Sequence, residues 1–177
     1  MRTATAERKR KVLRGGTWLL LCLLLVSCLS TTGLAREVRN VDFDWTFHHG
    51  DVPAAKAPDY DDAAWKTVDV PHDWSINGEY SPDNISGGRC GYLPSGIGWY
   101  RKVLQIRREW LDRKVLIRFD GIYMNSDVWL NGHRVGGRPY GYMSFHCDLT
   151  PYLRPGRNVL AVRVDNTKEP SSRWYHG

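Results

Sequence analysis

The chain has 177 residues, with 25 Lys and Arg against 19 Asp and Glu, for a formal net charge of +6. Residues 1–27 hold six of the basic residues and one acid, so 28–177 carry 19 basic and 18 acidic residues. This balance argues against a nucleic-acid or acidic partner, and the length suits one domain of ordinary size. All nine Tyr, all four Phe and seven of the eight Trp lie after residue 40, which excludes disorder and a coiled coil and favours an all-β domain.

The first segment is typical of a secretory signal peptide. A basic stretch ending at Arg14 precedes the apolar run 18–26, which is too short to span a bilayer comfortably. Two cleavage sites compete: residues 25–28 resemble a bacterial lipobox, in which Cys28 becomes the lipidated first residue, whereas 33–35 suit ordinary signal peptidase. A lipid on Cys28 would hold the protein at a membrane surface.

We therefore expect a signal peptide over 1–27 and a linker over 28–40. The mature chain is expected to be exported, either to the periplasm or as a lipoprotein associated with the outer membrane of a bacterium. Nothing else in the sequence predicts a membrane contact.

Two cysteines, Cys90 and Cys147, follow the predicted signal peptide and linker. An oxidising compartment permits a disulfide between them, but their spacing does not show whether their Cβ atoms meet, so two unpaired thiols are the alternative. The sequence has neither a CxxC motif nor the Cys/His spacing of a zinc site.

After residue 40 the sequence predicts short strands joined by polar turns. Residues 41–47 alternate between apolar and polar side chains, which is the period of a half-buried strand. The pair Asn131-Gly132 predicts a two-residue hairpin, because both residues tolerate positive φ. Further strands are predicted over 65–70, 98–106, 114–122, 127–130, 133–135, 144–149 and 158–165, and single helical turns over 107–113 and 150–153.

Two loops separate these strands. Residues 51–62 are rich in Pro, Ala and Asp, and we interpret Asp59, Asp61 and Asp62 as solvated, since they lack the pattern of a calcium loop. Residues 75–98 carry six Gly and two Pro and predict a long loop, of the kind that is functional or mobile in compact domains. Seven or eight short strands without a long helix indicate a sandwich or barrel, and we predict an all-β, jelly-roll sandwich.

Several segments, taken together and in order over 41–177, resemble the N-terminal sugar-binding domain of glycoside hydrolase family 2. This is the family of β-galactosidases, β-glucuronidases and β-mannosidases. The segments at 71–74, 92–94 and 138–142 look most like the β-galactosidase type. The matching segments are 45–47, 61–65, 70–74, 98–102, 119–121, 128–132, 141–142, 148–153, 158–166 and 173–175.

The resemblance implies a galactose-binding-like β-sandwich that precedes an immunoglobulin-like sandwich and a (β/α)8 barrel. In the family the barrel carries retaining hydrolysis by two glutamates, and neither can be assigned here. We therefore expect 41–177 to be a domain incomplete at its C-terminal end, from an exported β-galactosidase-like enzyme. This domain would help shape the pocket for a β-galactoside-like glycan but would have no activity alone, and no cofactor or metal ligand set is implied. The alternative is a free carbohydrate-binding lipoprotein.

The resemblance also implies where the substrate would bind. It brings Arg173, Trp174 and Tyr175 toward the mouth of the barrel, where aromatic faces stack on a sugar and a guanidinium donates to hydroxyls. Tyr92, in the loop 91–96, would border this site. Arg138, Tyr140 and Tyr142, after the Asn-Gly hairpin, would line the same cleft. For each of these residues the alternative is a packing or connecting role.

His72 and Asp73 look like a catalytic pair, and we interpret them instead as structural. They follow Pro71 at the end of a predicted strand, a position suited to hydrogen bonds with the backbone. Trp74 would pack beside them. No Gly-x-Ser-x-Gly elbow is present, which disfavours a serine hydrolase.

Overall fold

The computed structural model describes residues 36–84, 86–88 and 91–167 of a chain that divides into two units, Met1–Asn40 and Val41–Gly177. Of the first unit only 36–40 are described, and they form exposed coil. The predicted signal peptide, including Cys28, lies outside the described residues. In the described part of the chain, no helix is long and apolar enough to cross a bilayer.

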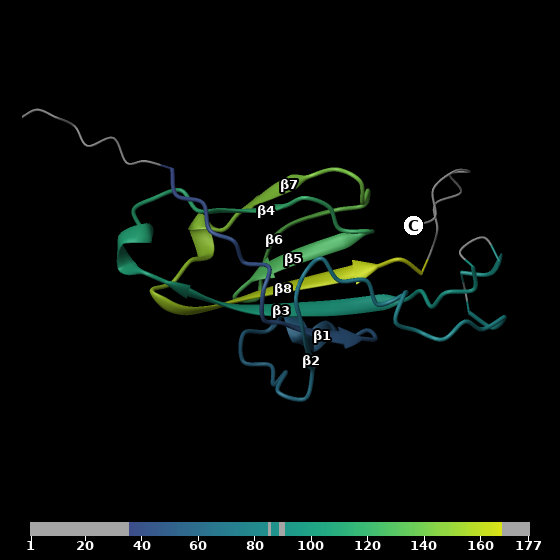
Figure 1. Ribbon diagram of the computed structural model, residues 1–177. Coiled ribbons are helices and arrows are strands. Elements are labelled where there is room, and N and C mark those ends of the chain that lie inside the picture. Colours follow the sequence, from purple (N-terminus) through teal and green to yellow (C-terminus); the bar gives the residue numbers. More distant parts are fainter. Residues whose placement is uncertain (1–35, 85, 89–90, 168–177) are drawn as a thin grey trace, which may run out of the picture. The chain divides into compact units, whose positions relative to one another are not determined.

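The second unit is a β-sandwich, as the sequence predicts (Figure 1). One sheet has six strands in the order β2-β1-β3-β8-β5-β6, and every neighbouring pair is antiparallel. The other sheet pairs β4 with β7, also antiparallel. The strands are β1 Trp45–His49, β2 Lys66–Val68, β3 Ile97–Ile106, β4 Leu116–Phe119, β5 Ser126–Leu130, β6 His133–Arg138, β7 Phe145–Asp148 and β8 Gly156–Asp165. Three short 3-10 helices join them: η1 Pro53–Lys56, η3 Arg108–Trp110 and η4 Thr150–Tyr152.

The first predicted strand starts later than its alternation suggests. Asp44 has a φ of +55°, in the left-handed region that a strand does not enter, so β1 begins at Trp45. Trp45 and Phe47 are buried as expected, but Phe43 is 59% exposed and is not part of the buried face. Likewise, the predicted helix over 107–113 is reduced to η3.

The hydrophobic core lies between the two sheets and follows the period of two. In β8, Leu160, Val162 and Val164 belong to the main core cluster, whereas Ala161 packs in a second cluster with Trp99. This second cluster includes Ala55 of η1, so the segment 51–62 covers the opposite face of the six-stranded sheet. Both faces of the central strands are therefore buried.

Arg101 fixes this covering segment to β3. Its side chain is 1% exposed, and its Nε donates to Oδ2 of Asp62 at 3.0 Å. Its other nitrogens donate to the backbone carbonyls of Ala55, Ala57 and Tyr60. The interpretation of Asp62 as solvated is therefore wrong. Although burial opposes its ionisation, hydrogen bonds from Thr46 and Arg101 hold the pKa of Asp62 below its ordinary value.

The hairpin prediction at Asn131-Gly132 is confirmed. Both residues have positive φ, of +50° and +85°, and they join β5 to β6. Cys147, in β7, is buried with a free thiol whose pKa burial raises to about 11, while Cys90 lies outside the described residues.

The two sheets meet closely where β6 passes β7. A Cβ added at Gly136 would lie 2.5 Å from Sγ of Cys147, so we expect Gly136→Ala to destabilise the domain by about 1–3 kcal/mol through overpacking. In a Cys147→Ala background the obstructing sulfur is gone, and the same change should cost less. Urea unfolding of the four proteins of this double-mutant cycle measures the difference. If Gly136→Ala lowers the free energy of unfolding equally in both backgrounds, the Cys147 sulfur does not obstruct the added Cβ.

Candidate functional site: one end of the sandwich

Strand register brings the described loops that carry Tyr92, Arg138 and Tyr140 to one end of the sandwich. The last residue of β1, His49, pairs with Gly98 near the start of β3, and Ile97 pairs with Asp165 at the end of β8. At the same end Ser126, which begins β5, pairs with Arg138, which ends β6. Figure 1 shows the loop before β3 on the side to which the arrow of β8 points. The loops 91–96 and 138–144 and the exit from β8 therefore share this end.

The exit of the chain from β8 is held in place by Asn166. Its side-chain Oδ1 accepts a hydrogen bond from the backbone N–H of Gly96 at 2.7 Å, and its own N–H donates to the Gly96 carbonyl at 3.0 Å. The next residue, Thr167, donates to Oδ1 of Asp165 from its hydroxyl at 2.5 Å. These bonds join the end of β8 to the loop that enters β3. The predicted substrate residues Arg173, Trp174 and Tyr175 lie outside the described residues.

Tyr92 lies in the loop 91–96 with a φ of +57° and a half-exposed side chain. The side-chain amide of Asn84 donates to its carbonyl at 2.6 Å, and the hydroxyl of Ser75 donates to the carbonyl of Pro94 at 2.7 Å. The two arms of the long predicted loop are thus tied to each other. Nothing in these contacts assigns Tyr92 a ligand.

Arg138, Tyr140 and Tyr142 lie together, as expected, at the same end of the sandwich. The Nη1 of Arg138 donates to the carbonyl of Ser144 at 3.1 Å, and the Tyr140 and Tyr142 rings are in contact at 5.7 Å between centroids. Sequence reasoning missed Tyr123, whose ring lies 5.5 Å from that of Tyr142. The motif Phe119-Asp-Gly121, two residues before Tyr123, is the signal that could have directed attention to it.

A cavity of about 920 Å³ opens between β4 and the six-stranded sheet. Core side chains line it from both sheets, including Tyr100 and Val162 on one side and Phe119 on the other. The indole Nε1 of Trp74 and the hydroxyl of Ser95 also border it, and both atoms are buried without a hydrogen-bond partner among the described residues. A smaller hollow of about 450 Å³ lies beside it.

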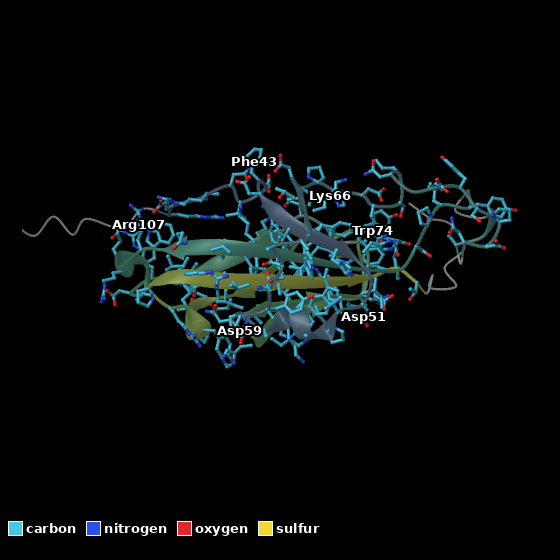
Figure 2. All side chains as sticks on the ribbon, turned by 90° about the horizontal axis from the view of Figure 1, so that it is seen from below. Phe43, Asp51, Asp59, Lys66, Trp74 and Arg107 are labelled. Atoms are coloured by element: carbon cyan, nitrogen blue, oxygen red, sulfur yellow. The ribbon has the colours of Figure 1, made fainter. Side chains whose placement is uncertain are left out.

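Trp74 lines the smaller hollow together with Lys66, His49 and Glu79. Figure 2 shows Trp74 and Asp51 near the end of β8, with Arg107 toward the opposite end of the strands. Trp74 stacks on Phe47, with the ring centroids 5.7 Å apart. This end of the domain therefore presents aromatic rings beside polar and charged groups.

His72 and Asp73 do not form a pair. His72 Nδ1 is hydrogen-bonded to the Tyr100 hydroxyl at 2.9 Å, and its ring packs edge-on against Phe47. Asp73 instead accepts the backbone N–H of Ser75 at 2.8 Å. These contacts are those of the structural role that we inferred from the sequence.

We expect His72 to make the domain less stable in mild acid. Its pKa lies below the ordinary 6.5 because burial, and then the charge of Lys66, disfavour the imidazolium, while Asp73 opposes this more weakly. The unfolded chain then takes up the proton first, so the contribution of His72 is complete above its unfolded pKa and is lost as the pH falls through the folded pKa. The measurement is the free energy of unfolding at a series of pH values from about 7 down to about 5. His72→Gln should flatten this profile, and a profile as steep as that of the unchanged protein would contradict this role of His72.

The carboxylates at this end are held as anions. Asp51 accepts a hydrogen bond from the Trp99 indole at 3.0 Å, which together with Arg163 holds the pKa of Asp51 below its ordinary value. Burial opposes the ionisation of Asp165, but hydrogen bonds from Thr167 and Arg163 lower its pKa as well. A general acid needs a raised pKa, so these groups are suited to binding and not to proton donation. Among the described residues, no group of three or more His, Cys, Asp or Glu could hold a metal ion.

Known proteins share this sandwich. The family model for the sugar-binding domain of family 2 glycosyl hydrolases matches residues 38–176. A β-galactosidase of Bacteroides ovatus is 48% identical over 155 residues, covering 86% of this chain and 18% of that protein. A candidate β-glucuronidase of Formosa agariphila is 45% identical over 157 residues, covering 88% of this chain and 15% of that protein.

A solved structure has the same fold. The crystal structure of a β-glycosidase from Bacteroides vulgatus superposes with a TM-score of 0.72 at 47% identity, over 75% of this chain and 17% of that one. The chain thus spans less than a fifth of the length of these relatives, all of which are glycosidases. The resemblance read from the sequence is confirmed: the chain belongs to glycoside hydrolase family 2, as its N-terminal sugar-binding domain.

Proposed function

We propose that this chain is the sugar-binding domain of an exported β-galactosidase-like glycosidase. It shapes the substrate pocket, while two catalytic glutamates lie in a barrel elsewhere in the parent protein. The observation that carries the proposal is the gathering of Tyr92, Arg138 and Tyr140 at one end of a family 2 sandwich. The chain leaves β8 at this same end, before Arg173, Trp174 and Tyr175 in the sequence, which suits a shared substrate-facing surface.

Aromatic rings beside anchored polar groups are suited to sugars. A pyranose has an apolar face that packs on an aromatic ring and hydroxyls that hydrogen-bond to side chains and backbone. Lowered pKa values keep Asp51, Asp62 and Asp165 ionised, so these three are not proton donors in glycoside hydrolysis. The contribution of this domain is therefore binding and orientation.

Galactose is the proposed sugar, with glucuronic acid as the second candidate. Identity to the Bacteroides ovatus β-galactosidase is 48%, only slightly above the 45% to the candidate β-glucuronidase. The discriminating experiment compares nitrophenyl β-galactoside with nitrophenyl β-glucuronide as substrates of the full-length gene product. Hydrolysis of the galactoside supports the proposal, and hydrolysis of the glucuronide alone overturns the choice of sugar.

Export is part of the proposal and rests on the leader-like residues 1–27. Cys28 is the proposed lipidation site, with the periplasm or the outer membrane as destination. An antibody against the sandwich, applied to fractionated cells, should detect a product far heavier than 20.3 kDa in the envelope. A glycan-binding product near that mass would instead favour a free carbohydrate-binding lipoprotein, and a cytoplasmic product would contradict export.

A further inference from the structure

Two loops at the site end are joined into one rigid unit. The backbone N–H of Asn125 donates to the carbonyl of Pro139 at 3.1 Å, and the Ser126 hydroxyl is hydrogen-bonded to the backbone of Arg138. The loops also approach closely at two glycines: a Cβ on Gly121 would lie 2.7 Å from the carbonyl oxygen of Gly141. Side chains carried by these loops are therefore held in fixed relative positions before any ligand arrives.

Three tyrosine rings form a row on this unit. Tyr142 is in the middle and makes edge-to-face contacts with Tyr123 and Tyr140, at interplanar angles of 61° and 60°. Tyr140 is 55% exposed and Tyr142 is 52% exposed, so these two rings face solvent, whereas Tyr123 is partly buried and packs against Gly141. Edge-to-face packing uses one edge or one face of each ring and leaves further ring surface for a ligand.

The small surface area of this row favours a saccharide over a protein as its ligand. A stable protein–protein interface buries roughly 1,200–2,000 Å² in total, far more than two half-exposed tyrosine rings and a partly buried third provide. A saccharide needs only a few rings and nearby polar groups, and the Tyr140 hydroxyl and the polar backbone of 138–144 supply the latter. The exposed rings of Tyr140 and Tyr142 lie 5.7 Å apart between centroids, so together they offer contacts to two neighbouring sugar rings.

We propose that Tyr123, Tyr140 and Tyr142 form a stacking surface for a saccharide chain of at least two units. The substrate class is then an oligosaccharide and not a glycoside of a single sugar. This inference rests on the proposed function, since it assigns the row to a glycan that the parent enzyme takes up. The ordered loops reduce the entropy cost of binding, because the rings need not be immobilised by the ligand.

The test compares two substrates of the full-length gene product, galactotriose and nitrophenyl β-galactoside. Tyr140→Ala should raise KM for galactotriose about tenfold, the loss expected for one stacking contact, with kcat unchanged. KM for the nitrophenyl glycoside should rise less than KM for galactotriose, since a single sugar contacts less of the row. Tyr140→Phe, which keeps the ring, should retain most of the galactotriose affinity.

The matched control is Tyr152→Ala. Tyr152 is a half-exposed tyrosine in η4, at the opposite end of the sandwich, and its ring stacks on His133. Its replacement should leave both KM values unchanged. The inference is overturned if Tyr140→Ala leaves KM for galactotriose unaltered, or if it raises KM for both substrates equally.

A direct binding measurement separates this inference from the proposed function. Galactotriose and a glucuronic-acid trisaccharide are titrated calorimetrically into the full-length protein and its Tyr140→Ala variant. One outcome is that the protein hydrolyses no β-galactoside but Tyr140→Ala weakens binding of either trisaccharide. This outcome contradicts galactose as the substrate sugar and supports the stacking surface. The other outcome is that β-galactosides are hydrolysed but Tyr140→Ala weakens binding of neither trisaccharide. This outcome contradicts the stacking surface and leaves the proposed function supported.

Discussion

Replacing Arg101 by alanine is expected to lower the free energy of unfolding of the domain by about 3–5 kcal/mol, the range for breaking a buried ion pair. The guanidinium is 1% exposed and supplies donors to Asp62 and to three backbone carbonyls of the segment 53–60. Without it the carbonyls of Ala55 and Tyr60 would lose this donor, while Asp62 would still accept from Thr46 and Ala57 from Tyr60, and the segment would lose four hydrogen bonds to β3. The measurement is urea unfolding followed by tryptophan fluorescence.

Two variants sharpen this result. Arg101→Lys keeps the charge but cannot reproduce the planar fork of donors, so it should recover only part of the lost stability. Arg134 provides the control, because it pairs with Asp127 while its side chain is 60% exposed, and Arg134→Ala should cost no more than about 1 kcal/mol. A loss at Arg101 as small as that at Arg134 would show that the buried network does not hold the segment.

Asn158→Ala is expected to cost about 3 kcal/mol, because it leaves several buried polar groups without partners. Asn158 is fully buried: its amide nitrogen donates to the carbonyls of Arg154 and Gly156, and its oxygen accepts from Arg154 N–H and from the side chain of Asn131. Asn131 in turn accepts the N–H of Val159 at 2.9 Å. Chemical unfolding of the domain measures the loss.

The chemistry of the amide, and not its volume, should set this cost. Asn158→Asp has nearly the same shape but replaces two donors by an acceptor facing carbonyls, so it should be at least as destabilising as alanine. Asn77 is the control, because it is exposed and makes one hydrogen bond, to the Asp73 carbonyl. Asn77→Ala should change stability by no more than about 0.5 kcal/mol. Tolerance of Asn158→Asp would refute the network.

Asn131 shows which of its roles the local sequence predicts and which it does not. Its place in Asn-Gly predicts the turn correctly, because positive φ is a property of the residue itself. Its bonds to Asn158 and Val159 depend on residues 27 and 28 positions away, which no turn rule includes. The side chain therefore serves the tertiary structure as well as the hairpin.

Asp62 and Asp44 show the opposite case, in which a local interpretation fails. Asp62 lies in a polar segment and reads as solvated, yet Arg101, 39 residues away, binds it against the sheet. The alternation over 41–47 continues through Asp44, although the backbone turns there and the strand begins one residue later. Hydrophobic periodicity predicts which side chains suit a strand, but it does not predict at which residue the backbone enters or leaves the sheet.

The sequence by itself determined the all-β class, most of the strands and the family, because alternation and short motifs are local properties. The family resemblance also predicted that Arg138, Tyr140 and Tyr142 line the substrate cleft, which stays a prediction. Only the tertiary structure decided the strand order, the burial of Arg101 and Asn158, and the addition of Tyr123 to the tyrosine row. The physical reason is that these features arise from contacts between residues far apart in the chain, whose free energy depends on the folded environment and not on the residue types alone.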